Sequence, residues 1–176
     1  MKLLDILPSG AKLIGDGNVE ITNLTFKSSE ARGGSLYFCI KGESFDGHDF
    51  AEIVSSQGAS AIVVERVQKV NIPQILVKDT RRSLSEICAN FYNHPERKLK
   101  FIGVTGTNGK TTTTFILRHI LKEAGYKVGV IGTQGTFING RSYKSSLTTP
   151  DPTELYSILS KMCDMGVDYV VMEASA

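Results

Sequence analysis

The feature that most constrains the fold is a glycine-rich segment, residues 106–112, which reads Gly-Thr-Asn-Gly-Lys-Thr-Thr. An apolar run, residues 101–105, comes directly before it, and a helical pattern, residues 110–124, follows. In a strand–turn–helix arrangement of this kind, backbone N–H groups and the helix N-terminus bind phosphate. The spacing departs from the common pattern, because Val104 stands where a glycine is usual. The context favours a nucleotide-binding loop over a glycine-rich turn with a solvated lysine.

The side chains around this loop have distinct expected roles. Lys110 would reach the β- and γ-phosphates of ATP, and the Thr111 hydroxyl would bind Mg²⁺. Glu173 ends a later apolar strand, where a carboxylate commonly holds Mg²⁺; the alternative is a capping or solvated glutamate. We therefore predict Lys110 and Glu173 as catalytic residues and Thr111 and Glu173 as metal ligands. The residues predicted to bind ATP are Gly106, Thr107, Asn108, Gly109, Lys110, Thr111 and Thr112.

The rest of the chain alternates short apolar runs with helical patterns, which is typical of an α/β fold with mostly parallel, covered sheets. We predict strands at residues 21–26, 36–40, 61–64, 75–77, 101–105, 127–132 and 168–172. We predict helices at residues 49–57, 80–92, 110–124 and 153–165, and a hairpin at 135–145 turning at Asn139-Gly140. The glycines of residues 129–135 belong to a strand end, because no helix follows as a dinucleotide-binding loop would require.

A polar stretch at residues 93–98 contains Pro95 and separates two domains, 1–95 and 96–176. The second domain stops at the end of a strand, where the ligand crevice of an open α/β sheet lies. We therefore expect an incomplete second domain.

Composition excludes several classes of function. A formal net charge of +2 is too small to indicate a nucleic-acid groove or a membrane surface. No segment approaches the roughly 20 apolar residues that span a bilayer. The three cysteines, Cys39, Cys88 and Cys163, lie in apolar stretches, so we expect buried free thiols in a reducing, cytoplasmic compartment.

The histidines offer no obvious site. His48, His94 and His119 have no partners at useful spacing, so we expect none of them in catalysis, and His119 as a surface or packing residue. Nothing in the sequence requires more than a monomer.

The ordered motifs resemble the MurE type of the Mur ligase family. In the second half these are residues 103–112, 132–133, 137–140, 147–152 and 172–175. In the first half they are residues 24–29, 34–38 and 46–48. The resemblance implies a small N-terminal uridine-nucleotide-binding α/β domain, followed by the first part of a P-loop central domain.

This resemblance also implies an activity. Members of this type are ATP- and Mg²⁺-dependent ligases of peptidoglycan synthesis, which add the third amino acid to UDP-N-acetylmuramoyl-L-Ala-D-Glu through an acyl phosphate. The implied substrate-binding residues are Phe26, Ser28, Thr148, Thr149 and Ser175. Because residues beyond Ala176 complete the site in the family, the chain alone is expected to be inactive.

Thr148 and Thr149 also stand out from the residues themselves, because Pro150 would hold them at a helix start with hydroxyl and N–H groups available to an anion. The alternative is an ordinary helix cap. The first domain departs from the family pattern in two places. Lys27-Ser28-Ser29 replaces Asp-Ser-Arg, and Glu43 stands near the expected diphosphate position, where its charge is unfavourable unless it points away.

Three alternatives stay open on the sequence. The first is another ATP-dependent amide ligase, either another Mur ligase or one like the folylpolyglutamate synthetases. The second is a non-catalytic nucleotide-binding module. The third is a P-loop GTPase, for which no guanine-reading motif is present before the chain ends. The sequence does not indicate which amino acid is added, whether diaminopimelate, lysine or another.

Overall fold

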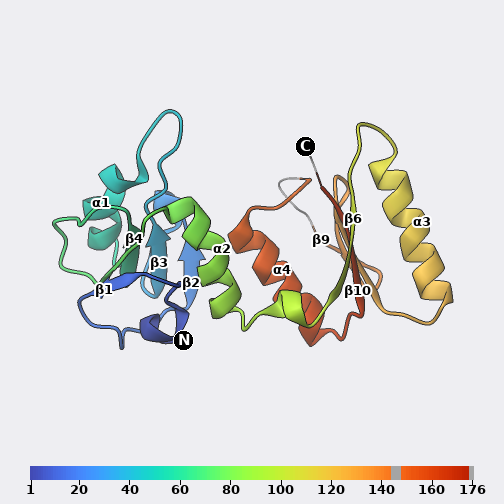
Figure 1. Ribbon diagram of the computed structural model, residues 1–176, viewed down its shortest axis with the longest axis horizontal. Helices are drawn as coiled ribbons and strands as arrows, with labels where there is room; N and C mark the ends of the chain where they lie inside the picture. Colours follow the sequence, from blue (N-terminus) through green and yellow to red (C-terminus); the bar gives the residue numbers. More distant parts are fainter. Residues whose placement is uncertain (144–147, 175–176) are drawn as a thin grey trace. The chain divides into compact units, whose positions relative to one another are not determined.

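The chain forms two compact units, Met1–Phe91 and Tyr92–Ala176, each with its own sheet (Figure 1). The structure is a computed structural model that describes residues 1–143 and 148–174. At the junction, Asn93 and His94 take left-handed conformations with φ of 56° and 52°. Pro95 then opens a short 3-10 helix that packs against the second unit. The junction therefore belongs with the second unit, whereas the predicted division lay after residue 95.

The first unit contains a five-stranded sheet in the order β1-β5-β4-β3-β2. Strands β2 to β5 are parallel, and β1 pairs antiparallel with β5 at the edge. The strands are β1 Lys12–Ile14, β2 Asn23–Thr25, β3 Ser35–Phe38, β4 Ala61–Val64 and β5 Gln74–Leu76. The helices are α1 Ala51–Ser56 and α2 Thr80–Phe91, with 3-10 helices η1 Leu3–Ile6, η2 Ser28–Glu30 and η3 Gly47–Phe50.

The middle of this sheet is apolar on both faces. Every residue of β3 and of β4 is buried, as expected for central parallel strands covered on both sides. Strands β2 to β5 were predicted, but β1 was not. Strand β1 has only three residues, which are too few to show the alternation of apolar and polar side chains by which a strand is recognised in a sequence.

The second unit contains a mixed five-stranded sheet in the order β6-β10-β7-β8-β9. Strands β6, β10 and β7 are parallel, whereas β8 and β9 continue the sheet as an antiparallel hairpin. The strands are β6 Lys100–Val104, β7 Val128–Gly132, β8 Gly135–Ile138, β9 Arg141–Tyr143 and β10 Tyr169–Glu173. The helices are α3 Lys110–Glu123 and α4 Pro152–Asp164, with the 3-10 helix η4 Pro95–Arg97.

Helices α3 and α4 lie on opposite faces of this sheet (Figure 1). The alternation of strand side chains explains the two layers, since Val130 packs with α3 while Ile131 packs with α4. Gly129 allows α4 to approach closely, because a Cβ there would come within 2.6 Å of the Met162 side chain.

The predicted hairpin turn is confirmed. Ile138 pairs with Arg141, and the two residues between them, Asn139 and Gly140, have positive φ of 47° and 86°. The last predicted hairpin residues, 144 and 145, lie outside the described part of the chain.

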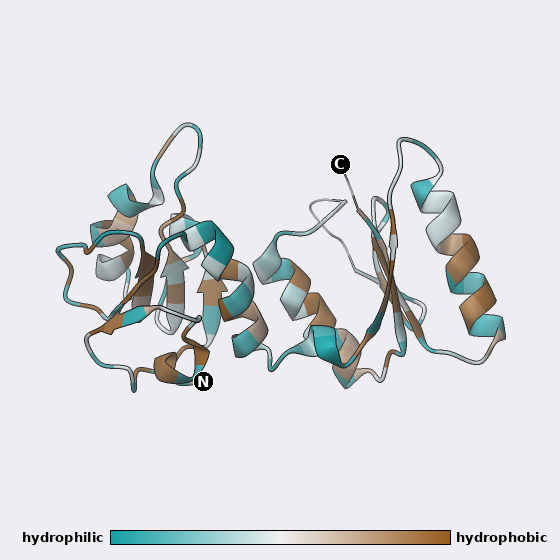
Figure 2. Ribbon diagram, viewed as in Figure 1, coloured by the Kyte–Doolittle hydropathy of each residue, from teal (hydrophilic) through white to brown (hydrophobic). Residues whose placement is uncertain are grey.

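Helices cover both faces of this sheet, as predicted, but the edge strand β6 is less covered than the other strands. Helix α3 packs mainly on β7 and β10, so Phe101 on the edge strand β6 stays 43% exposed. Figure 2 shows apolar turns in α3, and its Ile116 and Ile120 are more than half exposed.

Two of the three cysteines behave as predicted. Cys39 and Cys88 are buried, and all three thiols are free. Burial raises the pKa of Cys39 to about 12, so its thiol is not a nucleophile. For Cys163 the prediction of burial is wrong: it is half-buried on α4, with its sulfur 3.7 Å from the Pro95 carbonyl oxygen.

Helix α4 begins with a side-chain cap that can be tested. The Asp151 carboxylate accepts hydrogen bonds from the backbone N–H groups of Thr153 and Glu154, at 2.9 and 3.1 Å. Asp151→Ala should lower the free energy of unfolding of the second unit by about 1 kcal/mol in urea denaturation. Asp164→Ala is the matched control, because removing a carboxylate from the helix C-terminus should be neutral or slightly stabilising. Equal destabilisation by both variants would contradict the capping role.

Candidate functional site

The phosphate loop joins the end of β6 to the start of α3. Its backbone requires glycine at two positions, because Gly106 and Gly109 have φ of 145° and 77°. The Lys110 ammonium lies over the loop and donates to the Gly106 carbonyl oxygen at 2.6 Å. The lysine is therefore close to the backbone that would surround a phosphate group.

The N-terminus of α3 differs from those of the other two long helices. Helix α4 is capped by Asp151, and the first N–H groups of α2 donate hydrogen bonds to the carboxylates of Asp79 and Glu65. Helix α3 begins at Lys110 after the N-cap residue Gly109, which provides no side-chain cap, and it has no acidic residue in its first turn. Its first N–H groups and the positive end of its dipole are consequently available to an anion.

Glu173 ends β10 beside the strand from which the phosphate loop emerges. It is paired in register with Val104, and the Ala174 N–H donates to the Val104 carbonyl at 2.9 Å. The residue is 1% exposed, and its carboxylate accepts hydrogen bonds from the Thr133 hydroxyl at 2.9 Å and the Thr133 N–H at 3.3 Å. A metal ion at Glu173 would replace at least one of these hydrogen bonds.

Gly132 makes the position of this carboxylate possible. A Cβ at residue 132 would collide with the side chain of Glu173, including its Cδ at 2.7 Å. The glycine at the end of β7 is thus required by a side chain 41 residues later in the chain (173 − 132). In the sequence, residues 132 and 133 stood out as a strand end and as part of the family resemblance, but their contact with Glu173 was not predicted.

Thr148 and Thr149 lie at the same carboxyl ends of the parallel strands, next to Thr133 and Glu173. The Thr148 hydroxyl is 3.3 Å from the Thr133 hydroxyl, and the Thr149 hydroxyl donates to the Glu173 carbonyl oxygen at 3.3 Å. The expectation that they start the next helix is wrong, because α4 begins at Pro152 and Asp151 satisfies its first N–H groups. The remaining predicted substrate residue, Ser175, lies outside the described residues.

The chemistry of these groups fits Mg²⁺. Thr111 and Glu173 offer a hydroxyl and a carboxylate, and Mg²⁺ in phosphoryl-transfer sites takes few protein oxygens together with phosphate and water. Within residues 1–143 and 148–174, no three His, Cys, Asp or Glu side chains gather as a metal-binding group. The metal-binding role of Thr111 and Glu173 stays a prediction.

In the first unit, the other predicted substrate residues follow β2. Phe26 and Ser28 are both half-buried, and no hydrogen bond from the Ser28 hydroxyl is present within the described residues. Lys27, between them, forms an ion pair with Glu30 at 3.1 Å. Thr25 holds this short segment together, because its hydroxyl accepts from the Lys27 N–H and donates to Glu30. The lysine that departs from the family pattern thus has a local acidic partner.

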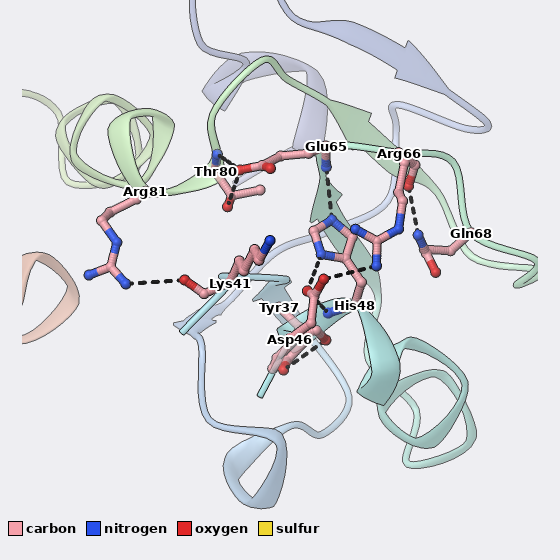
Figure 3. Close-up of polar contacts among 10 residues, drawn as sticks. Tyr37, Lys41, Asp46, His48, Glu65, Arg66, Gln68, Thr80 and Arg81 are labelled. Carbon is pink, nitrogen blue, oxygen red and sulfur yellow. Dashed lines mark hydrogen bonds and ion pairs between the residues drawn. The ribbon is translucent and has the colours of Figure 1, made fainter. Parts of the chain in front are cut away.

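A polar network occupies the ends of the neighbouring parallel strands (Figure 3). The Asp46 carboxylate accepts from the His48 ring at 2.6 Å and from Arg66 at 2.9 Å. The other ring nitrogen of His48 accepts the Glu65 N–H at 3.0 Å. His48 is therefore buried and doubly hydrogen-bonded, and the prediction that it lacks partners is wrong.

His94 also has a partner, Glu96, at 2.9 Å, whereas His119 is exposed as expected. Two of these contacts had a local signal, since Asp46 and Glu96 each stand two residues from their histidine. The bond to Glu65 had no such signal, because it spans 17 residues.

The same network fixes the loop of residues 41–46. Arg81 on α2 donates to the Lys41 carbonyl oxygen at 3.4 Å, and Lys41 and Asp46 form an isolated β-bridge at the base of the loop. Glu65 in turn accepts hydrogen bonds from the N–H and hydroxyl of Thr80. The loop, Ser28 and the start of α2 follow carboxyl ends of strands in one parallel sheet, where ligands of such folds bind.

The charge of Asp46 gives a pH-dependent prediction. Burial by itself would raise the pKa of Asp46, but the hydrogen bonds from His48 and Arg66 outweigh it and hold this pKa well below its usual range. A carboxyl with a depressed folded-state pKa stabilises the fold above its unfolded pKa of about 4 and loses that contribution as pH falls. The difference in free energy of unfolding between the wild type and Asp46→Asn should be largest at neutral pH and should decrease below about pH 4.

Urea denaturation between pH 7 and pH 2 measures this difference. Asp49→Asn, which removes an exposed carboxylate three residues away, is the matched control. A difference for Asp46→Asn that stays constant down to pH 2 would contradict the charge-assisted hydrogen bonds.

Comparison with known proteins agrees with this geometry. The family model of the Mur ligase family catalytic domain matches residues 20–92, and that of the Mur ligase middle domain matches residues 104–176. A UDP-N-acetylmuramoyl-L-alanyl-D-glutamate–2,6-diaminopimelate ligase of Geobacillus thermodenitrificans is 48% identical over 91% of this chain and 33% of its own length. The chain spans about a third of the length of the curated relatives it matches.

Two solved structures are similar. One, of a ligase with the same name, has a TM-score of 0.80 over 99% of this chain and 36% of that chain; at 22% identity it shows the fold alone. The other, the MurF ligase of Thermotoga maritima in complex with ADP, has a TM-score of 0.60 and 27% identity over 88% of this chain and 32% of that chain. Because Mur ligase family models match both units, the chain belongs to the Mur ligase family.

Proposed function

We propose that this chain is the N-terminal part of an ATP-dependent ligase that adds the third amino acid to UDP-N-acetylmuramoyl-L-Ala-D-Glu in peptidoglycan synthesis. The observation that carries the proposal is the uncapped N-terminus of α3, which follows the strand β6 that is paired with the buried Glu173. The relatives support the substrate, because they carry this activity in their names. We take the incoming amino acid to be 2,6-diaminopimelate on the same ground.

The reaction needs negative charge to be stabilised as a phosphoryl group moves. The γ-phosphoryl group of ATP passes to the glutamyl carboxylate, giving an acyl phosphate and ADP. The amine of the amino acid then attacks the acyl carbon, loses a proton, and releases phosphate as the amide forms. Lys110 and the N–H groups at the start of α3 hold the phosphates in place. Thr111 and Glu173 would hold Mg²⁺, which would supply further positive charge to these phosphates.

The first unit is proposed to bind the uridine nucleotide at the carboxyl ends of its parallel strands. The Ser28 hydroxyl is a donor for this ligand, and Phe26 offers an apolar surface beside it. Glu43 is exposed in the loop of residues 41–46, so it can turn toward solvent rather than toward a diphosphate.

Family membership leaves two of the alternatives as competing proposals. Another Mur ligase would bind a different acceptor, and a non-catalytic module would bind ATP without the uridine nucleotide. Membership of the Mur ligase family excludes the third alternative, a P-loop GTPase. No helix in the described residues is long and apolar enough to cross a bilayer. The three free thiols support a cytoplasmic location.

Calorimetric titration of UDP-N-acetylmuramoyl-L-Ala-D-Glu into the chain tests the substrate. We expect saturable binding, with UDP-glucose binding more weakly because it lacks the muramyl dipeptide. Ser28→Ala should weaken binding about threefold to tenfold through loss of one hydrogen bond, whereas Ser29→Ala, at its exposed neighbour, should not. Binding of ATP without any binding of the uridine nucleotide would favour the non-catalytic module.

Substitution at Gly132 tests the placement of Glu173. Gly132→Ala should displace the carboxylate and reduce the affinity for ATP in the presence of Mg²⁺ toward the value without Mg²⁺. Gly103→Ala is the matched control, because a Cβ at residue 103 meets nothing within 4 Å. Circular dichroism would verify the fold of both variants. Wild-type Mg²⁺–ATP affinity in Gly132→Ala would contradict the proposed metal site.

A further inference from the structure

The second unit has a pocket at the end of the sheet opposite the phosphate loop, where the parallel strands begin. Helix α3 starts at the loop and ends before β7, so its last turns lie at the amino ends of the parallel strands. There a cavity of about 370 Å³ opens beside the β8–β9 turn. It is lined by Arg118, Lys122, Tyr126, Lys127, Val128, Asn139 and Gly140. Lys110 and Lys122 are twelve residues apart on α3, or about 18 Å along its axis.

The lining is strongly basic. Arg118, Lys122 and Lys127 contribute three positive charges, and no acidic residue is among the described residues that line the pocket. The Asp168 carboxylate is bound to the backbone N–H of Lys127 at 2.8 Å, so it lies next to the pocket without forming part of its wall. Three cations around one cavity repel one another, and an anion between them would remove that repulsion.

Arg118 is held in place without an acidic partner. Its guanidinium lies 5.8 Å from the ring centres of both Phe115 and Phe137, which pack edge to face at 5.4 Å. Its Nε is buried and has no hydrogen-bond partner within the described residues. A guanidinium that lies against two aromatic rings is well suited to binding the oxygens of an oxyanion.

We propose that this pocket is a second anion site, which binds a small molecule bearing a phosphate group. Arg118 donates to the phosphate oxygens from its fixed position, and Lys122 and Lys127 add charge from the rim. Tyr126 and Asn139 provide an aromatic wall and a polar wall for the rest of the molecule. The cavity volume is sufficient for a small ligand.

The experiment uses the 176-residue chain carrying Lys110→Ala, so that binding at the phosphate loop is weakened. Inorganic phosphate is titrated while the Nε–H resonance of Arg118 is followed by ¹H–¹⁵N NMR. We expect a saturable shift of this resonance, and chloride at matched ionic strength should not reproduce it. Malonate, a dicarboxylate, is the comparison ligand, and phosphate should bind more tightly.

Two variants make the test specific. Lys122→Gln removes an exposed charge and should weaken phosphate binding about twofold to fivefold without affecting the fold. Arg118→Gln should reduce binding by about tenfold or more, measured by calorimetry. Arg32→Gln, at an exposed arginine of the first unit, is the matched control and should leave binding unchanged. An absent or chloride-like shift, tighter binding of malonate, or equal effects of Lys122→Gln and Arg32→Gln would overturn the proposal.

Discussion

The arrangement of the candidate site in the second unit, at the carboxyl ends of its parallel strands, depends on the buried carboxylate of Glu173. It occupies the space left by Gly132, accepts two hydrogen bonds from Thr133, and ends a strand that is paired with the strand before the phosphate loop. Burying a charge is costly unless hydrogen bonds compensate. Glu173 therefore ties the end of β10 to the residue that follows β7, and it is paired with the last residue of the strand that leads into the phosphate loop.

A similar constraint organises the first unit at the corresponding edge of its own sheet. Asp46 joins His48 and Arg66, and His48 joins the loop after β3 to the end of β4. In both units a carboxylate ties together loops that follow different parallel strands. Each unit thus fixes its loops at the strand ends, where α/β proteins bind ligands, while its core is built from ordinary apolar packing.

The sequence predicted what depends on local pattern. The seven expected strands and the helices of the second unit lie close to their expected bounds, because apolar periodicity and glycine stops are local signals. The sequence did not predict features that depend on contacts between residues far apart in the chain or on the exact cap of a helix. Thr133 and Glu173 meet across 40 residues, and the side chain that caps α4 is Asp151 rather than the preceding threonines. Edge position, which leaves Phe101 exposed, likewise depends on strand order and is not visible in β6 itself.

The most direct test of this account is the effect of Mg²⁺ on ATP binding to Glu173→Gln, measured by calorimetry. The variant keeps the size of the side chain and removes its charge, and Glu123→Gln on the exposed end of α3 provides the matched control. We predict that Mg²⁺ strengthens ATP binding to the wild type and to Glu123→Gln but has little effect on Glu173→Gln. The same Mg²⁺-dependent gain in all three proteins would contradict a metal-binding role for Glu173 and, with it, the proposed phosphoryl-transfer site.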